Sequence, residues 1–193
     1  CPRFRGPSFE TISAYGAHAA IPHYRVTDES NLALEPRGLY LVDSGGQYLD
    51  GTTDITRVVP VNNASDAMRR DFTLVLKAMI ALSVARFPRG TLSPMLDAIA
   101  RAPIWSAGID YGHGTGHGVG YFLNVHEGPQ SISRATPEPH MAMQPGMITS
   151  NEPGIYRPGR WGVRIENLVL AVPFENNEFG EFLQFEALTL CPI

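Results

Sequence analysis

The amino-acid sequence predicts one domain of the α+β class, in which short strands outnumber helices. Glycine (19) and proline (16) are both frequent among the 193 residues, which favours β-structure with many tight turns over a helical bundle. Hydrophobic residues make up 44% of the chain and charged residues 18%, a composition that excludes intrinsic disorder. No low-complexity stretch or linker divides the sequence, so we expect a single domain that spans residues 1–193.

Three predicted strands and a long helix occupy the first half of the chain. The strands are rich in β-branched or aromatic residues, and Gly and Pro bound them. They span residues 9–15, 39–44 and 52–59. Apolar residues then recur at helical spacing over residues 64–87. This pattern predicts a helix that is capped by Asn63 or Ser65 and ended by Pro88.

A shorter helix and four further strands complete the predicted elements. The helix starts at Ser93 and Pro94, turns Leu96 inward and stops near Pro103. The strands lie around residues 120–125, 147–151, 163–172 and 182–190. Strands therefore flank the helical region on both sides.

Charge and cysteine content exclude several classes of partner and compartment. A formal net charge of −4 and a pI near 5.8 argue against nucleic acid or an acidic membrane as a partner. No apolar run approaches the ~18 residues of a membrane span. Cys1 and Cys191 are the only cysteines, so we expect no disulfide framework and a reducing, cytoplasmic location.

Four acidic residues occupy matching places in two similar stretches of sequence. Residues 39–59 and 147–170 each contain an apolar strand, a carboxylate, a Gly-rich turn, a second strand and a second carboxylate. The acids are Asp43 and Asp54 in the first stretch, and Glu152 and Glu166 in the second. Each alone has an ordinary structural explanation as a turn cap or an ion-pair partner. Together, four acids inside apolar strands indicate two halves that face each other across one site.

A glycine-rich segment brings histidines to the same part of the sequence. His113, His117 and His126 fall in GHGTGHGVGYFLNVHEGP, where we expect the bare backbone to approach an ion or substrate closely. The segment matches neither a dinucleotide fingerprint nor a phosphate loop, and it lacks the second histidine of a helical zinc-protease motif. The cysteine count excludes zinc fingers, and the chain has no G-x-S-x-G nucleophile motif.

These exclusions leave a carboxylate-rich metal centre as the kind of site that the acids and histidines indicate. Oxygen donors with one imidazole suit Mn²⁺, with Zn²⁺ or Co²⁺ as substitutes, better than copper. Four clustered carboxylates carry a charge that two divalent ions cancel and one does not. We therefore expect two divalent metal ions.

Four motifs resemble those of the pita-bread metallopeptidases, and most closely the three-domain type of aminopeptidase P (Xaa-Pro aminopeptidase). The motifs are DSGGQYLDGTTDITR, HGTGHGVGYFLNVHEGP, TSNEPGIY and GVRIENLVL. The order Asp, Asp, His, Glu, Glu with spacings of 11, 63, 35 and 14 residues fits that family. The resemblance runs from about Ser8 to Ile193 and implies the pita-bread (creatinase/aminopeptidase) fold. In this fold, two pseudo-symmetric αβ halves surround a curved antiparallel sheet.

The resemblance assigns roles to individual residues. It implies five metal ligands, with Asp54 and Glu166 bridging the two ions. These ligands are Asp43, Asp54, His117, Glu152 and Glu166. It places His23, His113 and His126 in the substrate pocket, and it makes Glu152, His126 and His113 catalytic. We expect Arg164, two residues before Glu166 on the same strand face, to orient a ligand carboxylate.

The implied reaction removes the first residue from peptides that carry proline at the second position. A water held between two ions loses a proton, and the resulting hydroxide attacks the first peptide bond. Glu152 passes the proton to the leaving nitrogen while His126 donates to the oxyanion. A proline dipeptidase (prolidase) shares all five ligands and is the alternative enzyme. A catalytically silent peptide-binding module is the alternative outside enzymes.

The ends of the sequence predict a piece of a longer protein. The chain begins with Cys1 rather than Met, and it lacks the N-terminal domains of the resembling type and the start of its catalytic domain. We therefore expect a C-terminal catalytic-domain fragment that binds metal and hydrolyses Xaa-Pro peptides poorly or not at all when alone. For the full-length protein we expect a homo-oligomer.

Overall fold

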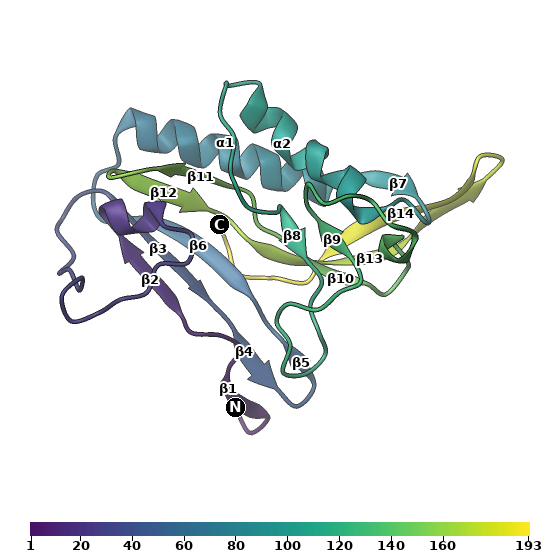
Figure 1. The fold of residues 1–193 in the computed structure, drawn as a ribbon, viewed down its shortest axis with the longest axis horizontal. Helices are drawn as coiled ribbons and strands as arrows, with labels where there is room; N and C mark the ends of the chain where they lie inside the picture. Colours follow the sequence, from purple (N-terminus) through teal and green to yellow (C-terminus); the bar gives the residue numbers. More distant parts are fainter.

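The computed structural model describes residues 1–193 and contains two α-helices and several short antiparallel sheets (Figure 1). The largest sheets have the strand orders β2-β3-β6 and β10-β13-β14-β7. Their strands are β2 (Ile12–Tyr15), β3 (Leu39–Ser44), β6 (Ile55–Pro60), β7 (Arg86–Pro88), β10 (Ile148–Asn151), β13 (Asn167–Asn177) and β14 (Gly180–Ala187). This mixture of helices and antiparallel sheets confirms the predicted fold class.

Smaller ribbons complete the strands. The first ribbon has the order β1-β4-β5, and β11 with β12 and β8 with β9 form antiparallel pairs. Their bounds are β1 (Phe4–Pro7), β4 (Gly46–Tyr48), β5 (Gly51–Thr52), β8 (Gly116–His117), β9 (Ser131–Ile132), β11 (Gly154–Arg157) and β12 (Trp161–Arg164). The strands β1, β4, β7, β8, β9 and β11 were not predicted, and each spans only two to four residues.

The two acid-bearing stretches fold in the same way. In the first, β3 pairs with β6 and the hairpin β4–β5 is inserted between them. In the second, β10 pairs with β13 and the hairpin β11–β12 is inserted between them. The sequence pattern therefore reflects a structural repeat of two antiparallel halves.

Two helices pack on the sheets, with α1 extended along one side and α2 beside it (Figure 1). Helix α1 (Asp66–Ser83) begins at the predicted cap Ser65, whose hydroxyl accepts the N–H of Met68. Helix α2 (Asp97–Trp105) follows the 3₁₀ helix η2 (Ser93–Leu96). Two further 3₁₀ turns are η1 (Gly16–Ala20) and η3 (Pro139–Met141). None of the helices is long and apolar enough to cross a membrane.

Two apolar clusters hold these layers together. One lies between α1, η1, the strands of the first half and the hairpin β11–β12, and includes Leu41, Val75 and Ile165. The other joins the end of α1 to the sheet of the second half, through Leu82, Val169 and Leu183. Helix α1 contributes to both, so it fixes the two halves relative to each other.

Several predicted elements differ from the structure. Residues 120–125 form a loop rather than a strand, since Gly120 N–H bonds the carbonyl of Asn124 within the loop itself. The predicted strand 163–172 is broken between β12 and β13, and helix α1 ends at Ser83 because residues 86–88 pair with β14 instead. Pro103 lies inside α2, which continues for two more residues. The ends of the other predicted strands differ from the observed ends by at most three residues.

Candidate active site

Two acidic residues reach the site from the first half. Asp43 lies in β3, Asp54 lies directly before β6, and both are buried. One oxygen of Asp43, Oδ2, accepts a hydrogen bond from Arg164 Nη2 at 2.7 Å. The other, Oδ1, is buried without any hydrogen-bond partner. A buried carboxylate oxygen is costly without a partner, so this atom fits a cation ligand.

The other two acids come from the second half, at the end of the ladder between β10 and β13. The last paired residues are Asn151 and Asn167, and Glu152 and Glu166 are the next residue on each strand. Glu166 is only 1% exposed, and its Oε2 accepts a hydrogen bond from the Thr56 hydroxyl at 2.8 Å. Glu152 N–H donates to the carbonyl of Thr115 at 2.7 Å. Both halves therefore direct their acids to one place.

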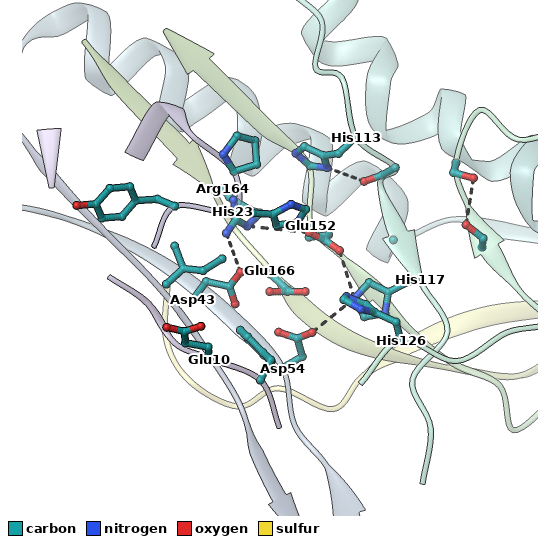
Figure 2. A pocket seen from close by; sticks show the side chains of 18 of the residues that line it. Glu10, His23, Asp43, Asp54, His113, His117, His126, Glu152, Arg164 and Glu166 are labelled. Atoms are coloured by element: carbon teal, nitrogen blue, oxygen red, sulfur yellow. Dashed lines mark hydrogen bonds and ion pairs between the residues drawn. The ribbon is translucent and has the colours of Figure 1, made fainter. Parts of the chain in front are cut away.

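His117 in β8 lies between the acids of the two halves (Figure 2). Its Nε2 is 3.5 Å from Asp54 Oδ2 and 3.4 Å from Glu152 Oε1. Its Nδ1 is 3.0 Å from the carbonyl of Gly118, which can only accept, so Nδ1 carries the ring proton of the neutral imidazole. In that tautomer the Nε2 lone pair faces the carboxylates, as in a metal-ligating histidine.

Burial and mutual repulsion shift the pKa values of Asp43, Glu152 and Glu166 upward. Burial raises the pKa of Glu152 to about 7, and raises that of Glu166 well above its usual value. The neighbouring carboxylates add to both shifts. Burial also raises the pKa of Asp43, and Arg164 opposes that shift. The site thus carries an excess of negative charge that one arginine does not offset.

The donor set fits divalent metal ions. Asp54, His117 and Glu166 each place one ligand atom within 4.8 Å of the others. Asp43 and Glu152 line the same cavity, of about 450 Å³. Hard oxygen donors in excess of positive charge are suited to Mn²⁺ and similar divalent ions.

The structure brings every predicted site residue to this one cavity. Besides the five candidate ligands, His23, His113, His126 and Arg164 line it. His23 and His126 are exposed, whereas burial lowers the pKa of the half-buried His113 to about 4. Figure 2 shows the three histidine rings around the acids. The placement agrees with the predicted site, and the individual roles remain predictions.

Arg164 contacts one of the candidate ligand carboxylates, although not that of Glu166. It is the last residue of β12, and Glu166 lies in the gap between β12 and β13, so the two residues do not belong to one strand. Its guanidinium instead bonds Asp43 and the hydroxyl of Tyr156, at 2.7 and 3.0 Å. The carboxylate that Arg164 contacts by hydrogen bonding is therefore that of Asp43.

The glycine-rich segment approaches protein backbone rather than open space. A Cβ on Gly116 would lie 1.9 Å from the carbonyl oxygen of Ser150, and one on Gly118 would lie 1.9 Å from that of Glu127. Glycine at these two positions therefore lets β8 pass close to its neighbours, which places His117 between the acids.

Sequence reasoning missed further residues of the cavity. Glu10 and Arg25 line it and form an ion pair at 3.4 Å, and Ser131 and Ser133 line it as well. None belongs to a motif, and each is a lone polar residue in a loop or short strand. Only the fold places them beside the acids.

Comparisons with known proteins give close relatives. The chain is 48% identical over 193 residues to a probable Xaa-Pro aminopeptidase P of Tuber melanosporum, covering 98% of this chain and 31% of that protein. It is 47% identical to a probable Xaa-Pro aminopeptidase P of Talaromyces marneffei, covering 99% and 30%. The chain thus spans about 30% of the length of these relatives.

Solved structures agree with these relatives. The X-prolyl aminopeptidase of Caenorhabditis elegans, described as a cytosolic enzyme with a di-nuclear active site, superposes with a TM-score of 0.93. It is 41% identical, over 100% of this chain and 31% of that one. A prolidase from Pyrococcus furiosus gives a TM-score of 0.82 at 32% identity, over 97% of this chain and 50% of that one. Residues 2–173 match the model of metallopeptidase family M24, and the chain belongs to that family.

Proposed function

We propose that this chain is the catalytic pita-bread part of a longer Xaa-Pro aminopeptidase, which releases the first residue of peptides with proline at the second position. The observation that carries the proposal is the convergence of four acids and His117, from both halves of the fold, on one cavity. The identity of 48% to a probable Xaa-Pro aminopeptidase P supports the substrate class. A cytoplasmic location and a homo-oligomeric full-length protein remain predictions.

The five candidate ligands would hold two divalent metal ions. The family resemblance makes Asp54 and Glu166 our candidates for the positions shared by both ions, and a ligand atom of each lies within 4.8 Å of one from the other. Asp43 would complete one position, and His117 with Glu152 the other. When bound, the ions would supply a water of lowered pKa and polarise the scissile carbonyl. Manganese is our choice among possible metals, from the hard donor set.

The remaining groups of the cavity would bind and orient the peptide. His126 is exposed and forms no hydrogen bond within the protein, so its ring can donate to the oxyanion that develops on the carbonyl. Glu152 would move a proton towards the leaving proline nitrogen, which must be protonated to depart. His23 and His113 would form walls around the rigid proline ring. Arg164 would fix the orientation of Asp43.

Both ring nitrogens of His113 are already engaged in the structure. Nδ1 lies 2.7 Å from the carbonyl of Gly114, and Nε2 lies 2.8 Å from the hydroxyl of Tyr156. We therefore propose His113 as a wall of the pocket rather than as a proton donor. This narrows the broader catalytic role that the motif implies for it.

Peptide length provides the test of this proposal. The purified chain, supplied with Mn²⁺, is incubated with an Xaa-Pro-Xaa tripeptide and an Xaa-Pro dipeptide, each with and without chelator. We expect chelator-sensitive release of the first residue from the tripeptide. Because the chain spans about 30% of its relatives, turnover below that of a complete enzyme still supports the assignment.

A prolidase is the second candidate, supported by the match to the Pyrococcus furiosus prolidase. Cleavage of the dipeptide alone would establish that function instead. If the chain binds two equivalents of metal and cleaves neither peptide, it acts as a silent peptide-binding module. Elemental analysis of the same preparation separates this case from a chain that has lost its metal.

A further inference from the structure

Arg101 is a fully buried charged residue that lies outside the cavity. It sits on α2, has an exposed fraction of 0%, and is not among the residues that line the site. Its guanidinium uses four of its five N–H groups. They bond Asp97 Oδ2 at 2.5 Å, Asp110 Oδ1 at 2.9 Å, and the carbonyls of Tyr111 and His113 at 2.8 and 2.7 Å.

A second set of hydrogen bonds closes this network. The free oxygen of Asp97, Oδ1, accepts from the Thr115 hydroxyl at 2.6 Å. That hydroxyl in turn lies 2.5 Å from the hydroxyl of Tyr111, whose ring stacks under the Arg101 guanidinium. Asp97, Arg101 and Thr115 are each at most 3% exposed. These three residues are therefore shielded from water, and only Asp110 lies at the exposed edge of the network.

The network holds the backbone on which the site depends. Arg101 fixes the carbonyl of His113, and the bond from Thr115 to Asp97 fixes the chain two residues before His117. The carbonyl of Thr115 also accepts the N–H of Glu152 at 2.7 Å. One buried cluster thus determines the position of His113, His117 and Glu152, which come from separate elements.

Stability alone is a weak explanation for a buried arginine of this kind. Taking a guanidinium and a carboxylate out of water is costly, and well-packed apolar residues of similar volume are often as stable or more so. An apolar residue at position 101 could not, however, hold three acceptors of one loop at fixed positions. A planar guanidinium can, since its donors form a rigid fork.

We propose that Arg101, with Asp97 and Thr115, is a positioning residue for the hydrolytic site, acting through the backbone of residues 111–115. The inference rests on the proposed hydrolytic function of the cavity. Arg101 touches neither peptide nor metal, so its loss should lower kcat and leave KM nearly unchanged. The effect arises because His117 and Glu152 shift, and misplacement by about 1 Å can cost about 100-fold in rate.

The test compares Arg101→Lys with the matched control Arg157→Lys. Arg157 also bonds a buried acid, Asp71, through two 2.9 Å contacts, but neither of these residues lines the cavity. Both lysine variants keep the charge and lose the planar fork. We expect both to lower Tm, and only Arg101→Lys to lower kcat, by about 10-fold to 100-fold. Equal kcat in the two variants would overturn the proposal.

A second readout is independent of activity. The His113 Nδ1 proton is bonded to the Gly114 carbonyl and should exchange slowly with water, as measured by ¹⁵N-edited NMR. We expect its protection to be lost in Arg101→Lys and kept in Arg157→Lys. If the wild-type chain cleaves no peptide, the proposed function is wrong. The exchange protection of the His113 proton is then the only test of the positioning role. Protection kept in both variants would overturn that role.

A second pair of variants covers the case in which Arg101→Lys does not fold. Thr115→Val removes the hydroxyl that bonds Asp97 at nearly constant volume, and Thr115→Ser retains it. We expect Thr115→Val to reproduce the loss of kcat and of ring-proton protection, and Thr115→Ser to restore both. A Thr115→Val variant with unchanged kcat and protection would contradict the network's positioning role.

Discussion

Two segments bring histidines to the cavity, and the protein holds them in different ways. The His113 segment (residues 108–115) is fixed by the buried guanidinium of Arg101. The His126 loop (residues 119–127) lies at the surface and is held by neutral hydrogen bonds, such as that from Leu123 N–H to the side chain of Gln47. Leu123 also adopts a φ of 67°, which is unfavourable for a residue with a side chain.

The imidazole rings of His113 and His126 differ in their contacts, as the two segments do. His113 uses both nitrogens within the protein, and burial lowers its pKa to about 4, so it stays neutral and fixed at physiological pH. His126 has no hydrogen bond, and its ring meets that of His117 edge-to-face at 4.2 Å. Burial and the neighbouring His117 lower the pKa of His126 as well. The difference indicates that His113 forms a fixed wall of the cavity, whereas His126 in the exposed loop has a ring N–H that is free to donate a hydrogen bond.

The largest effect should come from removing an acid of the cavity that both segments line. Asp54→Asn keeps the size of the side chain and removes its charge beside His117. We expect metal content to fall to one equivalent or none, and hydrolysis to fall by at least about 1,000-fold, because a bridging ligand is lost. Elemental analysis of the purified variant gives the metal content. Two retained equivalents would show that Asp54 does not bridge.

Removing the free donor should have the next largest effect. We expect His126→Ala to lower kcat by about 100-fold to 1,000-fold, which is the usual cost of one lost oxyanion donor. Metal content should stay at the wild-type level, because the proposed role involves no metal bond. His140→Ala serves as the control, since His140 is exposed and lies outside the cavity. Metal loss in His126→Ala would instead make His126 a ligand.

Chelation should make the stability of the fold depend on pH. Without metal, Glu152 and Glu166 have pKa values above those of the unfolded chain, so the folded state binds more protons. The free energy of unfolding should therefore rise as pH falls from about 8 to 6.5, by on the order of 1 kcal/mol per pH unit. Thermal melts in chelator at several pH values measure this change.

The window ends at pH 6.5 because His113 acts in the opposite direction below it. Its folded pKa of about 4 lies under the usual 6.5, so protonation of the unfolded chain removes stability as pH falls further. The metal-loaded chain is the control, since bound cations keep the carboxylates ionised. Chelated melts that do not change between pH 8 and 6.5 would contradict the repulsion among the acids.

The acids and histidines were predictable from the sequence because their surroundings are unusual. Asp43 and Glu166 interrupt apolar strands, and His113 and His117 each lie between two glycines, so residue type and neighbours together indicate chemistry. Arg101 gives no such signal, because an arginine in a short amphipathic helix normally faces solvent. Its burial follows from tertiary packing against residues 110–115, which local patterns do not encode.

The His126 loop shows a second limit of sequence patterns. Residues 120–125 contain Tyr121, Phe122 and Val125, whose β-propensity predicts a strand. In the structure, Tyr121 donates to the carbonyl of Leu49, and no neighbouring strand pairs with this stretch. Pairing partners decide whether a short apolar run becomes a strand, and here the neighbour is the tip of a hairpin.

The smallest effect should come from weakening the anchor of the His126 loop. Gln47 is buried, and its Oε1 accepts from both Leu123 N–H and the Thr52 hydroxyl. Gln47→Leu removes these neutral bonds, each worth about 1 kcal/mol, so we expect kcat to fall about fivefold with metal content unchanged. Arg101→Lys should exceed this loss, because charge-assisted bonds hold the His113 segment. Steady-state kinetics of both variants under one condition measure the ratio. A greater loss of kcat in Gln47→Leu than in Arg101→Lys would reverse the comparison. It would show that catalysis depends more on the position of the exposed His126 loop than on that of the His113 segment.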